Sequence, residues 1–194
     1  MMLFPRVVFV AGKKLAGKDT VCDRIVAEVP GFTKIHIATP WLKKHCEDMG
    51  IEYEREYLPN KAKYRAEIQR RAVRARTENP NCLVDMLPGV IDPLLAAGQH
   101  VAVSGIRFYN EALFAIERGY FVVQVTCPEE IRHERFRAVG EDLSRLNDPF
   151  EAELETLPCH LVIGGVWNPA YAVATIRRSY QYLLERQTEM QHAA

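Results

Sequence analysis

The feature that most constrains this sequence is a glycine-bounded loop between an apolar run and a helical pattern. Residues 7–11 form a continuous β-branched and aromatic run that stops at Gly12, as in a strand buried on both faces. The loop over residues 12–20 reads Gly-Lys-Lys-Leu-Ala-Gly-Lys-Asp-Thr, and apolar residues at helical spacing follow it until Pro30. A strand, such a loop and a helix form the context that a phosphate-binding loop requires.

Each part of this loop suits the binding of a nucleoside triphosphate. The glycines let consecutive backbone N–H groups turn inward around a β-phosphate, and the helix N-terminus adds positive potential. Lys18 is expected to span the β- and γ-phosphates of ATP. A strand-to-helix turn with chance glycines would not explain a lysine at the position that contacts phosphate. The residues expected to bind ATP are Gly12, Lys13, Lys14, Ala16, Gly17, Lys18, Asp19 and Thr20.

Asp19 stands where this motif usually has a serine or threonine that ligates Mg²⁺. Asp19 could hold the metal directly or through water, or it could cap the helix while Thr20 supplies a hydroxyl. We favour a position of Asp19 near the metal. Asp19 and Thr20 are therefore the candidate Mg²⁺ ligands.

The rest of the chain alternates strand and helix patterns. Further strands are expected at residues 33–38, 101–104, 121–126 and 161–163, and helices at 39–49, 59–76, 81–97, 110–118, from 128 onward and at 168–186. Such alternation implies right-handed crossovers and a parallel sheet. The sequence therefore predicts one α/β domain over residues 1–194, a three-layer α/β/α sandwich with a central parallel sheet of about five strands.

Composition narrows the classes of partner. The 25 basic and 25 acidic residues give a formal net charge of zero, so no global field draws the chain to duplex DNA. The five cysteines form no CxxC pair and fit reduced thiols. No stretch approaches the roughly 20 apolar residues of a membrane span, and the first apolar run is too short for a signal sequence. We therefore expect a cytoplasmic protein with no membrane partner.

The loop that ends in Gly-Lys-Asp resembles the loop of nucleoside-monophosphate-kinase-like proteins, notably phage deoxynucleoside monophosphate kinases. The loop of animal-type phosphomevalonate kinases is similar. Further likeness to the phage family follows in the same order along the chain, at residues 37–43, at Lys61, Arg65 and Gln69, and at residues 106–111. These matches run over about residues 6–165, and only the phosphate-binding loop is individually specific.

The resemblance implies where the acceptor would bind. In that family the segment after the second strand and a basic helix build the acceptor-nucleotide site, which here implies a mobile helical region over about residues 40–80. An arginine guanidinium can bind phosphate oxygens through two parallel hydrogen bonds, and a side-chain amide can bind the edge of a base. Residues of both kinds in this region agree with such a site. The implied acceptor contacts are Lys43, Lys61, Arg65, Gln69 and Arg107. Arg107 is also expected at the carboxyl end of a parallel strand, where open α/β sheets bind ligands.

The sequence departs from the family pattern at Gly105. Where the family has an aspartate before Val-Arg-Phe, this chain has Gly105 before Ile-Arg-Phe, so a carboxylate expected near the acceptor or metal is missing. Asp19 could compensate for the loss, or the acceptor could differ. The departure bears on the substrate more than on the type of reaction.

A cluster of arginines lies in the helix expected from Pro128, where a kinase of this kind has a lid over about residues 128–150. Arginines in a lid could neutralise the charge that spreads over the transferred phosphoryl group. The alternative is a charged surface helix whose arginines pair with neighbouring glutamates. The candidate catalytic residues are Lys18, Asp19, Arg107, Arg132 and Arg135.

These observations predict an ATP-dependent phosphotransferase that uses ATP and Mg²⁺ and transfers the γ-phosphoryl group to a nucleoside or deoxynucleoside monophosphate. Other acceptors stay open: phosphomevalonate, dephospho-coenzyme A or a hydroxymethylated base in DNA, the last disfavoured by the zero net charge. A regulatory nucleotide-binding ATPase is the alternative from another class, but residues 101–104 end without the acidic residue that it would need. A homodimer is compatible with the sequence.

Overall fold

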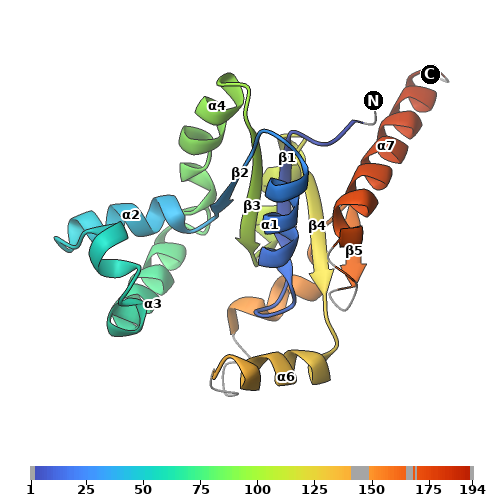
Figure 1. Ribbon diagram of the computed structural model, residues 1–194. Coiled ribbons are helices and arrows are strands. Elements are labelled where there is room, and N and C mark those ends of the chain that lie inside the picture. Colours follow the sequence, from blue (N-terminus) through green and yellow to red (C-terminus); the bar gives the residue numbers. More distant parts are fainter. Residues whose placement is uncertain (1–2, 141–148, 165–167, 169, 193–194) are drawn as a thin grey trace.

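Parallel strands form the centre of the molecule. The computed structural model describes residues 3–140, 149–164, 168 and 170–192. Within these residues one five-stranded sheet has the order β2-β3-β1-β4-β5, so the first strand of the chain lies in the middle of the sheet (Figure 1). All neighbouring strands run parallel. The strands are β1 (Val7–Ala11), β2 (Phe32–His36), β3 (His100–Ile106), β4 (Phe121–Thr126) and β5 (Leu161–Gly164).

Helices connect the strands, as the alternating pattern predicts. The α-helices are α1 (Lys18–Glu28), α2 (Thr39–Asp48), α3 (Lys61–Glu78), α4 (Pro88–Ala96), α5 (Tyr109–Glu117), α6 (Glu129–Ala138) and α7 (Ala170–His192). Shorter helical segments are the π-helix η1 (Tyr53–Tyr57) and the 3₁₀ helices η2 (Val84–Met86) and η4 (Pro149–Glu155). None of the helices within the described ranges is both long and apolar enough to cross a membrane.

The two faces of the sheet carry separate apolar cores. Because side chains alternate along a strand, Val8 of β1 packs with Ile25 of α1 and Ile176 of α7 in one core. On the opposite face of the sheet, Phe9 packs with Ile91 of α4 in a second core, which also includes residues of α5. All of these side chains are fully buried. The predicted three-layer α/β/α sandwich with a central parallel sheet is therefore confirmed.

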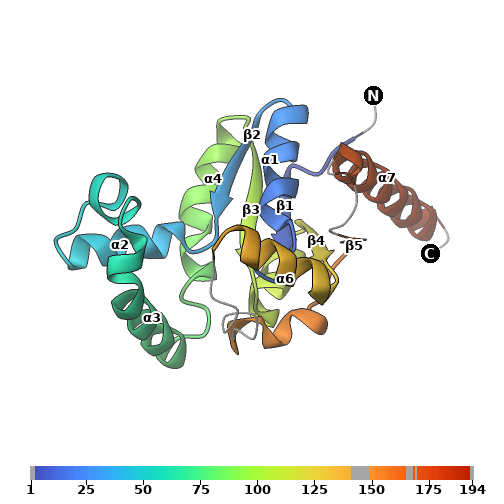
Figure 2. The same ribbon diagram turned by 60° about the horizontal axis from the view of Figure 1, so that its bottom comes forward.

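A helical arm, defined here as residues 39–78, extends from the edge of the sheet beside β2 (Figures 1 and 2). It contains α2, η1 and α3. The α3 helix has no fully buried residue, and only its Ile68, Ala72 and Ala75 pack against the core from a partly buried position. The arm matches the region expected to bind the acceptor, and that role stays a prediction, as does the single-domain interpretation of residues 1–194.

Some element boundaries differ from the prediction. The single helix expected over residues 81–97 is wrong, since a 3₁₀ turn ends at Met86 and α4 starts anew at Pro88. Proline suits the first turn of a helix because its missing N–H has no partner there. Strand β2 ends at His36 rather than at Ala38, because the chain turns there into α2. The 3₁₀ helix η4 was not predicted.

Candidate active site

The phosphate-binding loop joins β1 to α1 at the carboxyl ends of the strands. Gly12 has φ of +151°, and a Cβ atom there would lie 2.6 Å from the carbonyl oxygen of Val125 on β4, so this position requires glycine. Leu15 has φ of +60° and Gly17, which precedes α1, has φ of +109°. Residues with positive φ in such a loop turn successive N–H groups to one side, which creates an anion-binding nest.

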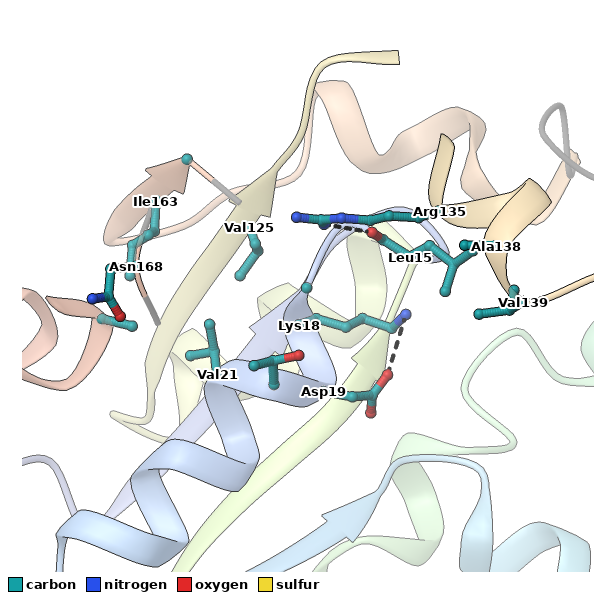
Figure 3. Close-up of a pocket in the computed structure, with 14 residues that line it drawn as sticks. Leu15, Lys18, Asp19, Val21, Val125, Arg135, Ala138, Val139, Ile163 and Asn168 are labelled. Carbon is teal, nitrogen blue, oxygen red and sulfur yellow. Dashed lines mark hydrogen bonds and ion pairs between the residues drawn. The ribbon is translucent and has the colours of Figure 1, made fainter. Parts of the chain in front are cut away.

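Lys18 is the first residue of α1 and is almost fully buried, with 5% of its surface exposed. Its Nζ atom lies 3.6 Å from a carboxylate oxygen of Asp19 (Figure 3). Burial lowers the pKa of Lys18, the charge of Arg107 adds to this shift, and Asp19 opposes it. An ammonium group held away from water, with the carboxylate of Asp19 at 3.6 Å, is well prepared to receive a phosphate.

The carboxylate of Asp19 fits the chemistry of a Mg²⁺ ligand. It is half exposed, and one of its oxygens lies 3.4 Å from Nζ of Lys34. Burial would raise the pKa of Asp19, but Lys18 and Lys34 outweigh it and lower the pKa, so the carboxylate is held ionised. The buried hydroxyl of Ser104, in the carboxyl-terminal half of β3, approaches Asp19 without a well-formed hydrogen bond. A carboxylate and an unsatisfied hydroxyl are the hard oxygen donors that Mg²⁺ prefers.

His36 fills the space beside Gly105. The pairing of β1 with β3 skips Gly105, which has φ of +91°. A Cβ atom at Gly105 would lie 2.4 Å from Nε2 of His36, so no larger residue fits unless the ring moves. The backbone N–H of Ala38 donates to Nδ1 of His36 over 3.2 Å. The imidazole of His36 therefore stands where the side chain of the family's aspartate would project.

Charged groups surround the His36 ring. Loss of hydration among the surrounding protein atoms lowers the pKa of His36 to about 4, with Lys18, Arg107 and Lys61 reinforcing the shift and Asp19 opposing it. His36 as a whole residue is nevertheless exposed to solvent, so a ligand can reach it. The charges of Lys18, Asp19, Arg107 and Lys61, all of them predicted site residues, thus act on a histidine that was not predicted.

Glu111 holds the turn that carries Arg107. Its buried carboxylate accepts hydrogen bonds from the backbone N–H groups of Arg107, over 2.8 Å, and Phe108, over 3.2 Å. The same carboxylate pairs with Arg76 of α3 at 2.9 Å, and the Arg76 guanidinium lies 4.0 Å from the centre of the Phe108 ring. The helical arm is therefore tied to the turn after β3.

The arginines of α6 are directed at the phosphate-binding loop. Arg132, with 1% of its surface exposed, donates to the carbonyl oxygen of Lys14 over 3.1 Å and pairs with Glu151 at 3.3 Å. Glu151 also accepts the backbone N–H of Lys14 over 2.5 Å. Arg135 donates to the carbonyl oxygen of Leu15 over 2.8 Å (Figure 3). The catalytic roles of Arg132 and Arg135 stay predictions, and residues 141–148 of the expected lid lie outside the described residues.

A cavity of about 460 Å³ opens beside the loop (Figure 3). One end is charged and is lined by Lys18, Asp19 and Arg135, and the hydroxyl-bearing Thr20 also lines the cavity. The other end is lined mainly by apolar residues, which are Val21, Val125 and Ile163, together with Asn168 (Figure 3). Ala138 and Val139 lie beside Arg135, and Ala172 also lines the cavity. The volume lies in the range of small-molecule sites, and the division into a charged and an apolar end matches the two parts of a nucleotide.

The other predicted residues occupy varied positions. Lys13 pairs with Glu155 at 3.3 Å, and Ala16 is buried under the loop. Lys43 pairs with Glu54 at 2.7 Å inside the arm. Arg65 is half-buried and Gln69 is exposed, both on α3.

Sequence reasoning missed His36, Glu111 and Glu151. A signal existed for Glu111, which belongs to the matched segment at residues 106–111. His36 offered only the weak signal of a polar residue near the end of a predicted strand. Glu151 offered none, since it binds the backbone of Lys14, 137 residues away.

No protein-family model and no curated protein matches the sequence. Solved structures do match. Shikimate kinase from Aquifex aeolicus is 17% identical with a TM-score of 0.53, over 92% of this chain and 98% of that one. A sugar kinase from Janibacter sp. HTCC2649 is 15% identical with a TM-score of 0.53, over 88% and 91%. The tunicamycin resistance protein of Deinococcus radiodurans is 13% identical with a TM-score of 0.53, over 92% and 96%. With its parallel five-stranded sheet and glycine-bounded loop, this chain has the fold of the P-loop kinases.

Proposed function

We propose that this protein is an ATP-dependent phosphotransferase whose acceptor is a nucleoside monophosphate, specifically a deoxynucleoside monophosphate. The observation that carries the proposal is the buried ammonium of Lys18 at the charged end of a nucleotide-sized cavity. Burial of an ammonium costs free energy unless an anion compensates it. The triphosphate of ATP is such an anion, and the nest of the loop would hold it.

ATP would lie along the cavity. Its base would occupy the apolar end near Val125 and Ile163, and its phosphates would lie over the loop beside Lys18. Arg135 lines the charged end and donates to the carbonyl oxygen of Leu15, so its guanidinium is held close to where the phosphates would lie.

Mg²⁺ would be held by Asp19, with the hydroxyl of Ser104 beside it. When bound, the ion would neutralise charge on the phosphate oxygens. Thr20 lines the cavity next to Asp19 and remains a candidate for the same role.

The acceptor would approach from the side of the helical arm. Lys61 belongs to the arm, and its charge acts on His36 together with those of Arg107 and Lys18, so the electrostatic surroundings favour an anionic acceptor. The ionised phosphate of a nucleoside monophosphate can attack the γ-phosphorus of ATP without prior removal of a proton. The likeness of the loop and of residues 106–111 to deoxynucleoside monophosphate kinases supports the same acceptor.

The proposal is tested by measuring ADP formation with Mg-ATP and a panel of ribonucleoside and deoxynucleoside monophosphates, with the product identified by mass. Lys18→Met removes the charge and keeps much of the shape, so we expect turnover to fall at least about 100-fold. Arg24→Ala is the matched control, because Arg24 lies on the exposed face of the same helix and pairs only weakly with Glu28.

Each outcome has a distinct meaning. Diphosphate formation from one or two monophosphates, lost in Lys18→Met and kept in Arg24→Ala, would establish the activity. Turnover of alcohols such as dephospho-coenzyme A, with no turnover of monophosphates, would show that the acceptor is an alcohol and not a nucleoside monophosphate. Slow ATP hydrolysis that no acceptor stimulates would support the regulatory ATPase instead.

A further inference from the structure

The starting point is the exchange of groups at Gly105 and His36. The resembling family has a carboxylate at position 105, whereas here the backbone has φ of +91° and the imidazole of His36 lies against the glycine. A carboxylate, which is negatively charged and can accept a proton, is thus replaced by the imidazole ring of His36 from the neighbouring strand β2. A side chain at position 105 and the ring of His36 in this position would overlap, so the protein can have only one of the two groups there.

The hydrogen bond at Nδ1 decides which nitrogen of His36 carries the proton. The backbone N–H of Ala38 donates to Nδ1, so Nδ1 offers its lone pair and holds no proton. The ring proton is therefore on Nε2. In this arrangement Nε2 is a hydrogen-bond donor, and it cannot take a proton from an incoming group.

The surroundings of His36 favour an anion at this donor. The positive charges of Lys18 on α1, of Arg107 in the turn after β3 and of Lys61 on α3 all act on the ring. The nearby carboxylate of Asp19 is already paired with Lys18 and Lys34. A ligand placed at Nε2 would meet one N–H donor and several positive charges.

We infer that His36 contacts the acceptor, donating a hydrogen bond from Nε2–H to an ionised phosphate oxygen, and that the site thereby selects phosphate monoesters over alcohols. The inference rests on the proposed function and specifies its substrate class. In the reaction an anionic oxygen of the acceptor forms a bond to the γ-phosphorus, the bond from that phosphorus to the β–γ bridging oxygen breaks, and ADP leaves. No proton has to leave the acceptor. An alcohol would have to lose its proton, and a donor at Nε2 cannot accept it.

Kinetics of three variants test the contact. His36→Ala is expected to raise the KM for the preferred monophosphate about 10- to 100-fold, the usual effect of losing a hydrogen bond to a charged group, while the KM for ATP changes little. His36→Asn keeps an N–H donor and should recover part of the loss. Gly105→Ala retains His36 but displaces its ring, so it should raise the same KM. His160→Asn is the control at a histidine remote from the loop.

The tautomer provides a readout that does not depend on turnover. Nitrogen NMR of the histidine rings should show the proton of His36 on Nε2. His160 is an internal reference, since its Nδ1 likewise accepts a backbone N–H, from Val122 over 3.0 Å. With the loop filled by a non-hydrolysable ATP analogue, added inorganic phosphate should shift the Nε2 signal of His36 and leave that of His160 unchanged.

The outcomes separate this inference from the proposed function. A proton on Nδ1, no response of His36 to phosphate, or an unchanged monophosphate KM in His36→Ala would overturn the inference and leave the proposed function standing. Turnover of alcohols in place of monophosphates by the wild type would overturn both. A shift of His36 with phosphate, together with a raised monophosphate KM in His36→Ala and Gly105→Ala, supports both.

Discussion

At the scale of single residues, the ion pair of Arg132 and Glu151 joins α6 and η4 to the phosphate-binding loop. Both side chains are almost fully buried, and both also bind the backbone of Lys14. Two opposite charges in a dry environment stabilise the fold only while both are present, because each would otherwise be desolvated without compensation.

Removal of one partner should therefore destabilise the protein strongly. We expect Arg132→Met or Glu151→Gln to lower the free energy of unfolding by about 3–5 kcal/mol, and the double variant Arg132→Met/Glu151→Leu to lose less than the sum of the two. Urea unfolding measures these values. Arg118→Ala is the control, because its pair with Asp92 is exposed and should contribute at most about 1 kcal/mol. Single variants as stable as this control would contradict the interpretation.

The first glycine of the loop offers a second prediction at this scale. Gly12→Ala places a Cβ atom against the carbonyl oxygen of Val125 and forces alanine into φ of +151°, so we expect a loss of about 2–4 kcal/mol in the free energy of unfolding. Gly89→Ala is the control, since nothing lies near its Cβ position in α4 and alanine favours a helix. Equal thermal stability of the two variants would show that the strand β4 does not restrict the loop.

At the scale of elements, Glu111 connects α3 with the turn after β3. The α3 helix has no fully buried residue, so this one buried contact should contribute much of its attachment. We predict that Glu111→Gln, which leaves Arg76 without its charged partner, increases amide hydrogen exchange along residues 61–78. Mass spectrometry of the exchanged peptides measures the change. Arg74→Ala removes an exposed pair on the same helix and should have little effect, and similar exchange in both variants would argue against the connection.

The sequence predicted the elements with a local signal better than the contacts between them. The bounds of β1 and β4 agree with the predicted runs, because a buried parallel strand reads as a continuous apolar segment. The loop and the position of Lys18 followed from a motif with a defined geometry. Glu151 and His36 could not be found in this way, since their roles come from partners on other strands and helices. The break at Pro88 could have been inferred from the proline itself.

At the scale of the whole molecule, three histidines couple the stability of the fold to pH. Burial lowers the pKa of His36 to about 4, and it also lowers the pKa of His100, at the start of β3, and of His160, just before β5. In the unfolded chain these side chains bind protons near pH 6.5, whereas in the folded protein they stay neutral to lower pH. The unfolded state therefore binds more protons below about pH 6.5, and the free energy of unfolding must fall as the pH decreases there.

We therefore expect the wild type to be less stable at pH 5.5 than at pH 7 in urea unfolding. His160→Gln can still accept the N–H of Val122 but does not titrate, so the difference between the two pH values should become smaller. An unchanged difference in this variant would mean that folding does not lower the pKa of His160.

The carbonyl oxygens of Lys14 and Leu15 are held by two arginines of α6, Arg132 and Arg135. A loop that is already fixed in its binding shape loses little conformational entropy when the triphosphate arrives, so more of the interaction energy appears as affinity. The same contacts link the stability of α6 to the affinity for ATP, and this link acts in both directions. Whatever loosens α6 should weaken the affinity for ATP, and bound ATP should in turn make α6 harder to unfold.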